Sequence, residues 1–176
     1  MSGRRILIAG IGNIFLGDDG FGSEVARRLL ERSSSEGVEV RDFGIRGLDL
    51  AYSLLDRYEL AILIDAVPRG ERPGTLFVIE PDLNGINDAT AGNGLVEAHA
   101  VDPLSVLRLV NSMGGRFGRI LIVGCEPADF GPPDEGRIGL SLPVAEAVGR
   151  AVEKVQIIVD DYLATQVNPT ATASRS

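Results

Sequence analysis

The chain has 176 residues, of which 44% are hydrophobic, and its 17 Lys and Arg against 25 Asp and Glu give a formal net charge of −8. A single domain of this length buries about 70% of the surface that its unfolded chain exposes, so it needs no disulfides to fold. The acidic balance argues against broad binding of nucleic acids or anionic membranes. The single cysteine, Cys125, predicts a reducing compartment, and no apolar run approaches the ~18 residues of a membrane span. We therefore expect a cytoplasmic protein.

The first part of the chain predicts alternating strands and helices. The continuous apolar run at 5–9 is typical of a strand buried on both faces of a parallel sheet. Residues 20–32 then show the apolar spacing of an amphipathic helix. A strand at 38–43, a helix at 48–58 and a fully apolar strand at 60–66 follow. This β-α-β-α-β series indicates a parallel sheet covered by helices.

The second part adds an edge strand and two helices. Residues 75–80 are expected to form a strand, and because no helix precedes it, an antiparallel edge is favoured. Residues 81–101 have no clear periodicity, and a loop of that length is typically functional or disordered. The apolar patterns beyond that loop predict a helix at 103–113, a central strand at 119–124, an irregular connection at 125–139 and a long helix at 142–163.

We accordingly predict one domain over residues 1–163, followed by a flexible tail over 164–176. Its fold class is α/β, a three-layer α/β/α sandwich around a mostly parallel central sheet of about five strands. Cys125 is expected to be a small apolar residue at a strand end rather than a reactive thiol.

Two adjacent aspartates, Asp18 and Asp19, stand where the first strand gives way to a helix. The unpaired N–H groups of a first helical turn attract anions, but this pair already occupies that field and would repel a pyrophosphate. We therefore expect a metal ion or another cationic group as the ligand at this position. A purely structural alternative is that one of the two caps the helix.

Three acid or imidazole side chains map to one edge of the predicted sheet. Asp19 follows the first strand, Asp65 ends the third, and His99 lies in the long loop before the helix at 103–113. Ligands of open α/β sheets bind beyond the carboxyl ends of the strands, so we expect these three to converge. Two carboxylates and one imidazole suit a divalent ion such as nickel, zinc, manganese or iron. The spacing does not choose among these ions.

Each of these residues also has a structural explanation. Asp65 ends an apolar strand and would be costly to bury without a partner, which a helix N-terminus could supply as well as a metal. His99 alone could be a solvated loop histidine. Asp102, just before Pro103, is best explained as a helix N-cap. The chain has no HExxH, cysteine pair, GxSxG or P-loop motif, so zincin, serine-hydrolase and NTPase chemistry have no support.

The motifs together resemble those of the hydrogenase maturation proteases, endopeptidases that trim the C-terminal extension from the large-subunit precursor of nickel–iron hydrogenases. The strongest part of the resemblance is the segment GIGNIFLGDDGFG at residues 10–22. Asp65-Ala66, His99 and Gly139-Leu140-Ser141 follow in the order of the family.

The resemblance implies a function for the three converging residues. Asp19, Asp65 and His99 would recognise nickel that is already inserted in the precursor, and other divalent ions can occupy the same site. Either the ion polarises the scissile carbonyl and activates a water, or a carboxylate acts as general base. The implied partner is the nickel–iron hydrogenase large-subunit precursor, and we expect a monomer.

The resemblance also implies a substrate-binding loop after the second strand. Its candidate residues in this chain are Asp42, Gly44 and Gly47. Phe43 and Ile45 are larger than the residues often found at the corresponding positions of the family.

Two other functions remain open at this stage. In a dinucleotide-binding domain, Gly10-x-Gly12 would follow a strand and Asp42 would take the ribose-binding position. Against it, Phe15 replaces the third glycine of the motif, and the Asp18-Asp19 pair lies near the phosphate site. The second is a non-catalytic, nickel-dependent assembly checkpoint, which would bind the precursor without cutting it.

Overall fold

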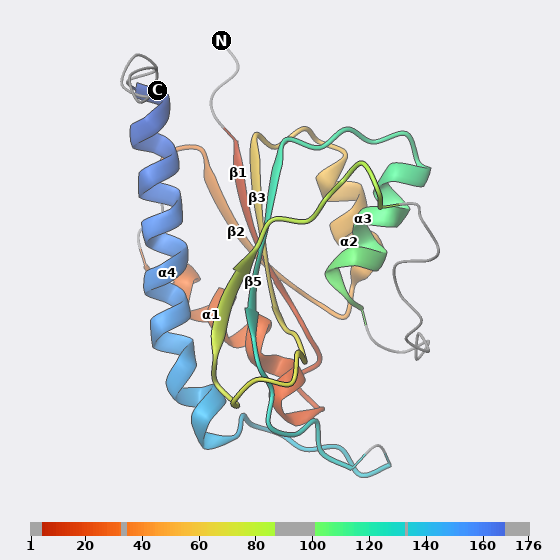
Figure 1. The fold of residues 1–176 in the computed structure, drawn as a ribbon, viewed down its shortest axis with the longest axis vertical. Coiled ribbons are helices and arrows are strands. Elements are labelled where there is room, and N and C mark those ends of the chain that lie inside the picture. Colours follow the sequence, from red (N-terminus) through yellow and green to blue (C-terminus); the bar gives the residue numbers. More distant parts are fainter. Residues whose placement is uncertain (1–4, 33–34, 87–100, 133, 168–176) are drawn as a thin grey trace.

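The computed structural model describes residues 5–32, 35–86, 101–132 and 134–167, and its core is a twisted sheet with helices on both faces (Figure 1). The strand order is β2-β1-β3-β5-β4, and every pairing is parallel except that of β4 with β5. The strands are β1 (Ile6–Ile11), β2 (Val38–Gly44), β3 (Leu60–Ala66), β4 (Leu76–Ile79) and β5 (Arg119–Cys125). The helices are the 3₁₀ helix η1 (Gly17–Gly20), α1 (Phe21–Leu30), α2 (Gly47–Leu54), α3 (Pro103–Ser112) and α4 (Leu142–Val167).

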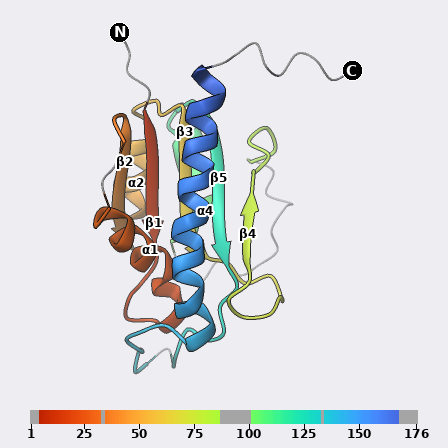
Figure 2. The same cartoon turned by 90° about the vertical axis from the view of Figure 1, so that its left-hand side faces the viewer.

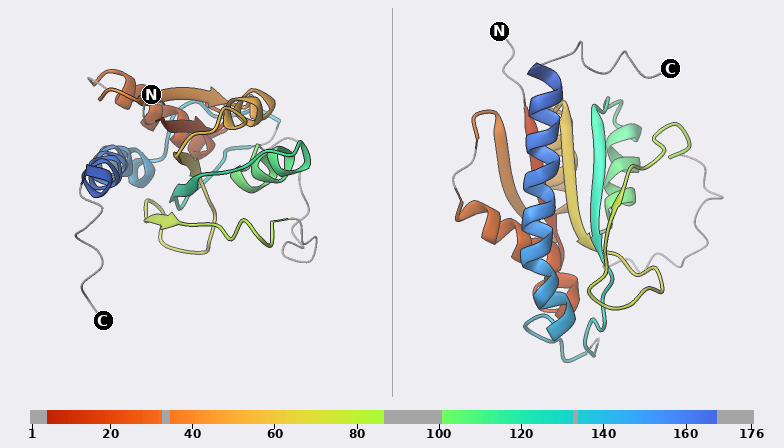
Figure 3. Two further views of the ribbon diagram at one scale, coloured as in Figure 1. Left: turned by 90° about the horizontal axis from the view of Figure 1, so that it is seen from above. Right: turned by 60° about the vertical axis from the view of Figure 1, so that its left-hand side comes forward.

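The helices form two outer layers. Seen from above, α1 and α4 lie on one side of the sheet and α2 and α3 on the other (Figure 3). Figure 2 shows α4 running lengthwise over its face of the sheet. The predicted three-layer α/β/α sandwich with a mostly parallel sheet is confirmed, and so is the antiparallel edge strand.

The two apolar layers explain why the central strands are apolar without interruption. Ile6 and Ile8 of β1 pack in the core under α1 and α4, whereas Leu7 and Ala9 pack in the core under α2 and α3. Successive side chains of a strand point to opposite faces, so a strand covered on both faces needs apolar residues at every position.

Two helices end four residues away from their predicted ends. Helix α2 ends at Leu54, four residues before the expected end at 58, and the chain then turns through Arg57, whose φ is 55°. A positive φ in a residue with a side chain is incompatible with continuing a right-handed helix. Helix α4 instead continues to Val167, beyond the expected end at 163.

The strand order creates a topological switch point between β1 and β3. From β1 the chain moves to β2 on one side, and it later returns to place β3 on the other side. The loops that leave β1, β3 and β5 gather at the lower edge in Figure 1, where α4 begins. Ligand sites of open α/β sheets form at such a point. Within the described residues, no helix is long and apolar enough to cross a membrane.

Candidate active site

The loop after β1 brings the backbone of η1 very close to Gly12. Gly12 has a φ of 143°, and a Cβ atom there would lie 1.8 Å from the carbonyl oxygen of Asp19. Only glycine allows this approach. The approach turns the Asp19 carboxylate back towards the loop, where its Oδ2 accepts a hydrogen bond from the Asn13 N–H at 2.9 Å. Partial burial raises the pKa of Asp19, and the bond from Asn13 offsets part of that rise.

Asp65 lies at the carboxyl end of β3, where only 4% of its surface is exposed. Its Oδ1 is the single buried side-chain oxygen or nitrogen without a hydrogen-bond partner in the described part of the chain. Burial raises the pKa of Asp65 well above its usual range, and the charges of Asp19 and Asp102 raise it further. Asp19 and Asp65 lie at the same edge of the sheet, because η1, which carries Asp19, packs against β3.

Two other buried carboxylates show how unusual Asp65 is. Glu126 accepts hydrogen bonds from the backbone N–H groups of Arg69 at 2.7 Å and Gly70 at 3.2 Å. Asp18 accepts four hydrogen bonds, described next. A buried polar group without a partner costs about 1–3 kcal/mol. Such a cost at the end of a central strand, beside a second acid, points to a ligand that would satisfy the free oxygen.

Asp18 has a structural role that the sequence did not reveal. It is completely buried, and its carboxylate accepts bonds from the N–H groups of Ala128, Asp129 and Ser141 and from the Ser141 hydroxyl. It thereby joins η1 to the connection before α4. Neither aspartate of the pair caps α1, because its N-cap is Gly20 and no side chain bonds there. The capping alternative is wrong, and only Asp19 of the pair is left for a ligand.

The remaining expected ligand, His99, lies outside the described residues, which end at 86 and resume at 101. Across the residues that are described, no group of three His, Cys, Asp or Glu side chains could hold a metal ion. The convergence of His99 with Asp19 and Asp65 therefore stays a prediction. Asp102, three residues after His99, caps α3 through a bond from the Ser105 N–H at 3.0 Å, with proline in the first turn, as expected.

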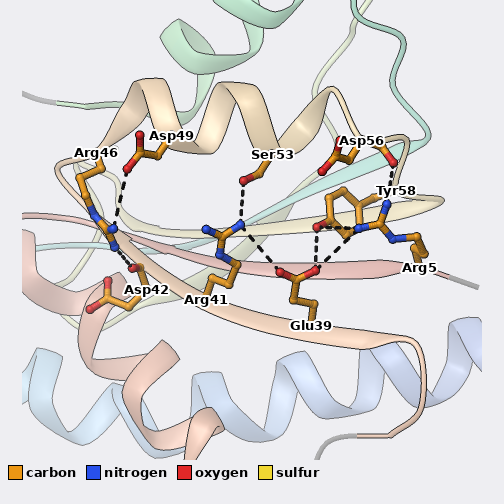
Figure 4. Close-up of polar contacts among 9 residues, drawn as sticks. All are labelled: Arg5, Glu39, Arg41, Asp42, Arg46, Asp49, Ser53, Asp56 and Tyr58. Carbon is orange, nitrogen blue, oxygen red and sulfur yellow. Dashed lines mark hydrogen bonds and ion pairs between the residues drawn. The ribbon is translucent and has the colours of Figure 1, made fainter.

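The loop between β2 and α2 is held by side chains at both ends. Oδ1 of Asp42 accepts bonds from the Ser23 hydroxyl at 2.8 Å and from the Gly44 N–H at 2.9 Å. Arg46 donates to the carbonyl of Asp42 at 2.6 Å and pairs with Asp49 at 3.7 Å (Figure 4). Gly44 has a φ of 55°, a conformation that residues with a Cβ rarely adopt.

Gly47 also has a geometric reason to be glycine. A Cβ atom there would lie 2.9 Å from Cγ1 of Val101, so α2 approaches the start of the α3 segment closely. The loop is joined to the Asp19 side of the site, because the Gly12 N–H donates to the carbonyl of Gly44 at 3.0 Å. The candidate substrate-binding residues thus flank one short connection beside the switch point, with Asp42 and Gly44 at the end of β2 and Gly47 at the start of α2.

The rest of the polar cluster in Figure 4 lies further along β2 and stabilises the sheet edge. The Tyr58 hydroxyl donates to Glu39 at 2.7 Å, and Arg41 donates to Ser53 at 2.8 Å. Burial and the hydrogen bond with Glu39 raise the pKa of Tyr58 to about 12. Cys125 is fully buried and burial raises its pKa to about 12, which agrees with the expected apolar role.

Comparison with known proteins identifies the family. The model of the hydrogenase maturation proteases matches residues 23–158. This chain belongs to the hydrogenase maturation protease family. It is 31% identical over 153 residues to the hydrogenase expression/formation protein HupD of Rhizobium leguminosarum bv. viciae, an alignment that covers 85% of this chain and 71% of HupD.

Solved structures agree with this assignment. A hydrogenase 2 maturation peptidase from a Thaumarchaeota archaeon shares 30% identity with a TM-score of 0.67, over 89% of this chain and 99% of that one. The maturating endopeptidase HybD of Escherichia coli, at 24% identity, shares the fold with a TM-score of 0.73, over 90% and 93% of the two chains.

As a hydrogenase maturation protease, the chain is an endopeptidase, a hydrolase of peptide bonds. Proteins of this family act on hydrogenase large-subunit precursors. The family assignment therefore identifies an endopeptidase in place of the alternative dinucleotide-binding domain. Sequence reasoning missed the Asp18–Ser141 contact, although both residues belong to the segments that carry the family resemblance. The sequence offered one signal for a separate role of Asp18, because a single ligand site next to the first strand does not need two adjacent acids.

Proposed function

We propose that this maturation protease removes the C-terminal extension of a nickel–iron hydrogenase large-subunit precursor after recognising nickel that is already inserted. In this proposal, nickel is part of the substrate and meets Asp19, Asp65 and His99 at the switch point. The observation that supports it best is the unpartnered Oδ1 of Asp65, which is buried at the end of β3, the strand that η1 with Asp19 packs against. A divalent cation would supply the partner that this oxygen lacks.

The two carboxylates suit different parts of the task. Asp19 is half-buried and held by the Asn13 N–H, so its orientation is fixed before a substrate arrives. Asp65 resists ionisation in the free protein, and an approaching cation favours its charged form. Once ionised, a carboxylate next to the scissile bond can accept the proton of the attacking water, as in aspartic-type peptidases. Alternatively, the nickel of the substrate polarises the scissile carbonyl, and the two carboxylates only bind that nickel.

The loop with Asp42, Gly44 and Gly47 is proposed to contact the substrate. Asp42 is exposed, yet Ser23 and the Gly44 N–H fix its Oδ1. A groove of ≈ 280 Å³ runs between this loop and the segment that follows β1. An ordered exposed acid at the border of a groove is suited to select among substrates. Action in the cytoplasm and a monomeric state stay predictions.

The deciding experiment is co-expression of a nickel–iron hydrogenase large-subunit precursor with and without this protein, in nickel-replete and nickel-depleted medium. Mass spectrometry should show a shortened large subunit only when both the protein and nickel are present. His99→Ala and Asp19→Asn should abolish the shortening. Glu80→Gln, a change at an exposed ion pair beyond the edge strand β4 and away from the site, is the matched control and should leave it intact.

Three results would contradict the proposal in different ways. If the His99→Ala variant shortens the large subunit at the wild-type rate, His99 has no part in the mechanism. If the large subunit is shortened in nickel-depleted medium, cleavage does not depend on recognising nickel. A stable complex with the precursor and no shortened product would favour the assembly checkpoint instead of a protease.

A further inference from the structure

A second groove lies between α1 and the first turns of α4, and we call it the α1–α4 groove. Its volume is ≈ 480 Å³, within the range of about 300–1,000 Å³ that is usual for ligand pockets. Its lining includes two isoleucines and several small residues. These are Ile14, Ile138, Gly17, Gly20, Ser23 and Ala145.

The two isoleucines expose an unusual amount of apolar surface. Ile14 is 52% exposed and Ile138 is 81% exposed. They do not belong to a loose loop, because the Gly17 N–H donates to the carbonyl of Arg137 at 2.7 Å and the Arg137 N–H donates to that of Phe15 at 2.8 Å. Large apolar side chains held open to water beside a groove are typical of an interaction site.

The two arginines of the groove are already paired with an acid of the same helix. Arg27 lies 2.7 Å from Glu24 and Arg28 lies 3.3 Å from the same carboxylate. Oδ1 of Asp42 is occupied by the hydroxyl of Ser23. Both arginines are thus occupied by Glu24, and the rest of the lining consists mostly of small and apolar residues, among them Ile14, Ile138 and Ala145. An uncharged, apolar ligand fits it best.

The groove is continuous with the candidate active site. It shares Ile14, Ser23 and Asp42 with the smaller groove beside the β2–α2 loop. That smaller groove includes Asn13, whose N–H binds the carboxylate of Asp19. A polypeptide that reaches Asp19 can therefore continue along one surface into the α1–α4 groove.

We propose that the α1–α4 groove binds an extended, apolar stretch of the protein substrate, next to the segment that is cut. This inference rests on the proposed function, because it takes the protein substrate to be positioned at Asp19. The family acts on protein precursors, so the partner on this edge is a polypeptide. Its binding segment is apolar because small and apolar residues line most of the groove and the two arginines there are occupied by Glu24.

The test fills the groove without touching the acids. Ala145→Arg places a long side chain into the groove from an accessible helical position, and Ala164→Arg makes the same change at an exposed position near the other end of α4. Nickel-loaded precursor is titrated against each purified variant, and KM and kcat are measured separately. Ala145→Arg should raise KM at least about tenfold with kcat within about twofold of wild type. Ala164→Arg should change neither.

A second variant and a binding assay keep the two proposals apart. Ile138→Glu removes an exposed apolar wall, so it should weaken precursor binding and leave thermal stability unchanged. Binding of fluorescently labelled precursor is measured by anisotropy, independently of cleavage. The wild-type protein could bind the precursor without cutting it, while Ala145→Arg and Ile138→Glu bind it poorly. That result would support the proposed role of the groove and overturn the proposed proteolysis. Cleavage with unchanged KM in both variants overturns the groove alone, and wild type that neither binds nor cleaves overturns both.

Discussion

Asp18 and Ser141, 123 residues apart in the chain, are joined by two hydrogen bonds. The Ser141 N–H donates to Oδ1 of Asp18 at 2.7 Å, and the Ser141 hydroxyl donates to Oδ2 at 2.9 Å. Because Ser141 immediately precedes α4, the carboxylate also lies at the positive end of that helix. The contact fixes η1, and with it the neighbouring Asp19, against the longest helix of the protein.

Asp18→Asn is expected to destabilise the fold by about 1–3 kcal/mol, because an amide NH₂ replaces one of two oxygens that face only donors. Urea unfolding monitored by circular dichroism measures the change. Ser141→Ala, which removes the hydroxyl bond alone, should cost about 1 kcal/mol. Asp49→Asn at an exposed ion pair should stay within about 0.5 kcal/mol of wild type. An Asp18→Asn protein as stable as that control would show that the clamp is energetically unimportant.

Asp65→Asn is expected to stabilise the substrate-free protein at neutral pH. Burial and the nearby charge of Asp19 raise the pKa of Asp65, so the folded state holds a proton that the unfolded chain releases above about pH 4. Wild type therefore loses stability as the pH rises from about 4 towards that raised pKa, and the asparagine variant lacks this loss.

Thermal unfolding of wild type and Asp65→Asn, followed between about pH 4 and 8, measures the difference. The Tm of the variant should exceed that of wild type increasingly towards neutral pH, while precursor processing is lost. Such an exchange of stability for function is common where an active site holds a destabilising group. Parallel Tm curves for the two proteins would show that Asp65 does not titrate differently in the folded state.

Local patterns were sufficient to predict most of the fold. Continuous apolar runs predicted β1 and β3, because a strand covered on both faces carries apolar residues at every position instead of alternating apolar and polar ones. Asp102 before Pro103 gave the start of α3 because capping involves neighbours in the sequence. The same locality explains the edge strand β4, whose antiparallel pairing followed from the absence of a preceding helix.

The unpredicted features depend on partners that are distant in the sequence. The role of Asp18 comes from Ala128 and Ser141, and nothing near Asp18 encodes those contacts. Helix α2 ends before Arg57, whose positive φ prevents a helix from continuing to 58 and has no local sequence signature. Apolar periodicity likewise continued past that point, since Tyr58 packs into the same core from outside the helix.

The tight packing of α1 against the sheet at Gly22 gives the last prediction. A Cβ atom there would lie 2.1 Å from the carbonyl oxygen of Ile64 and 2.2 Å from that of Ile11, so α1 would have to move away from both strands of the switch point. Gly22→Ala should therefore cost about 3 kcal/mol or more. Gly149→Ala in α4, where a Cβ would meet nothing within 4 Å, should instead stabilise by about 0.5–1 kcal/mol through helix propensity. Urea unfolding of both variants measures these opposite signs, and equal effects would mean that α1 is not held at this contact distance in solution.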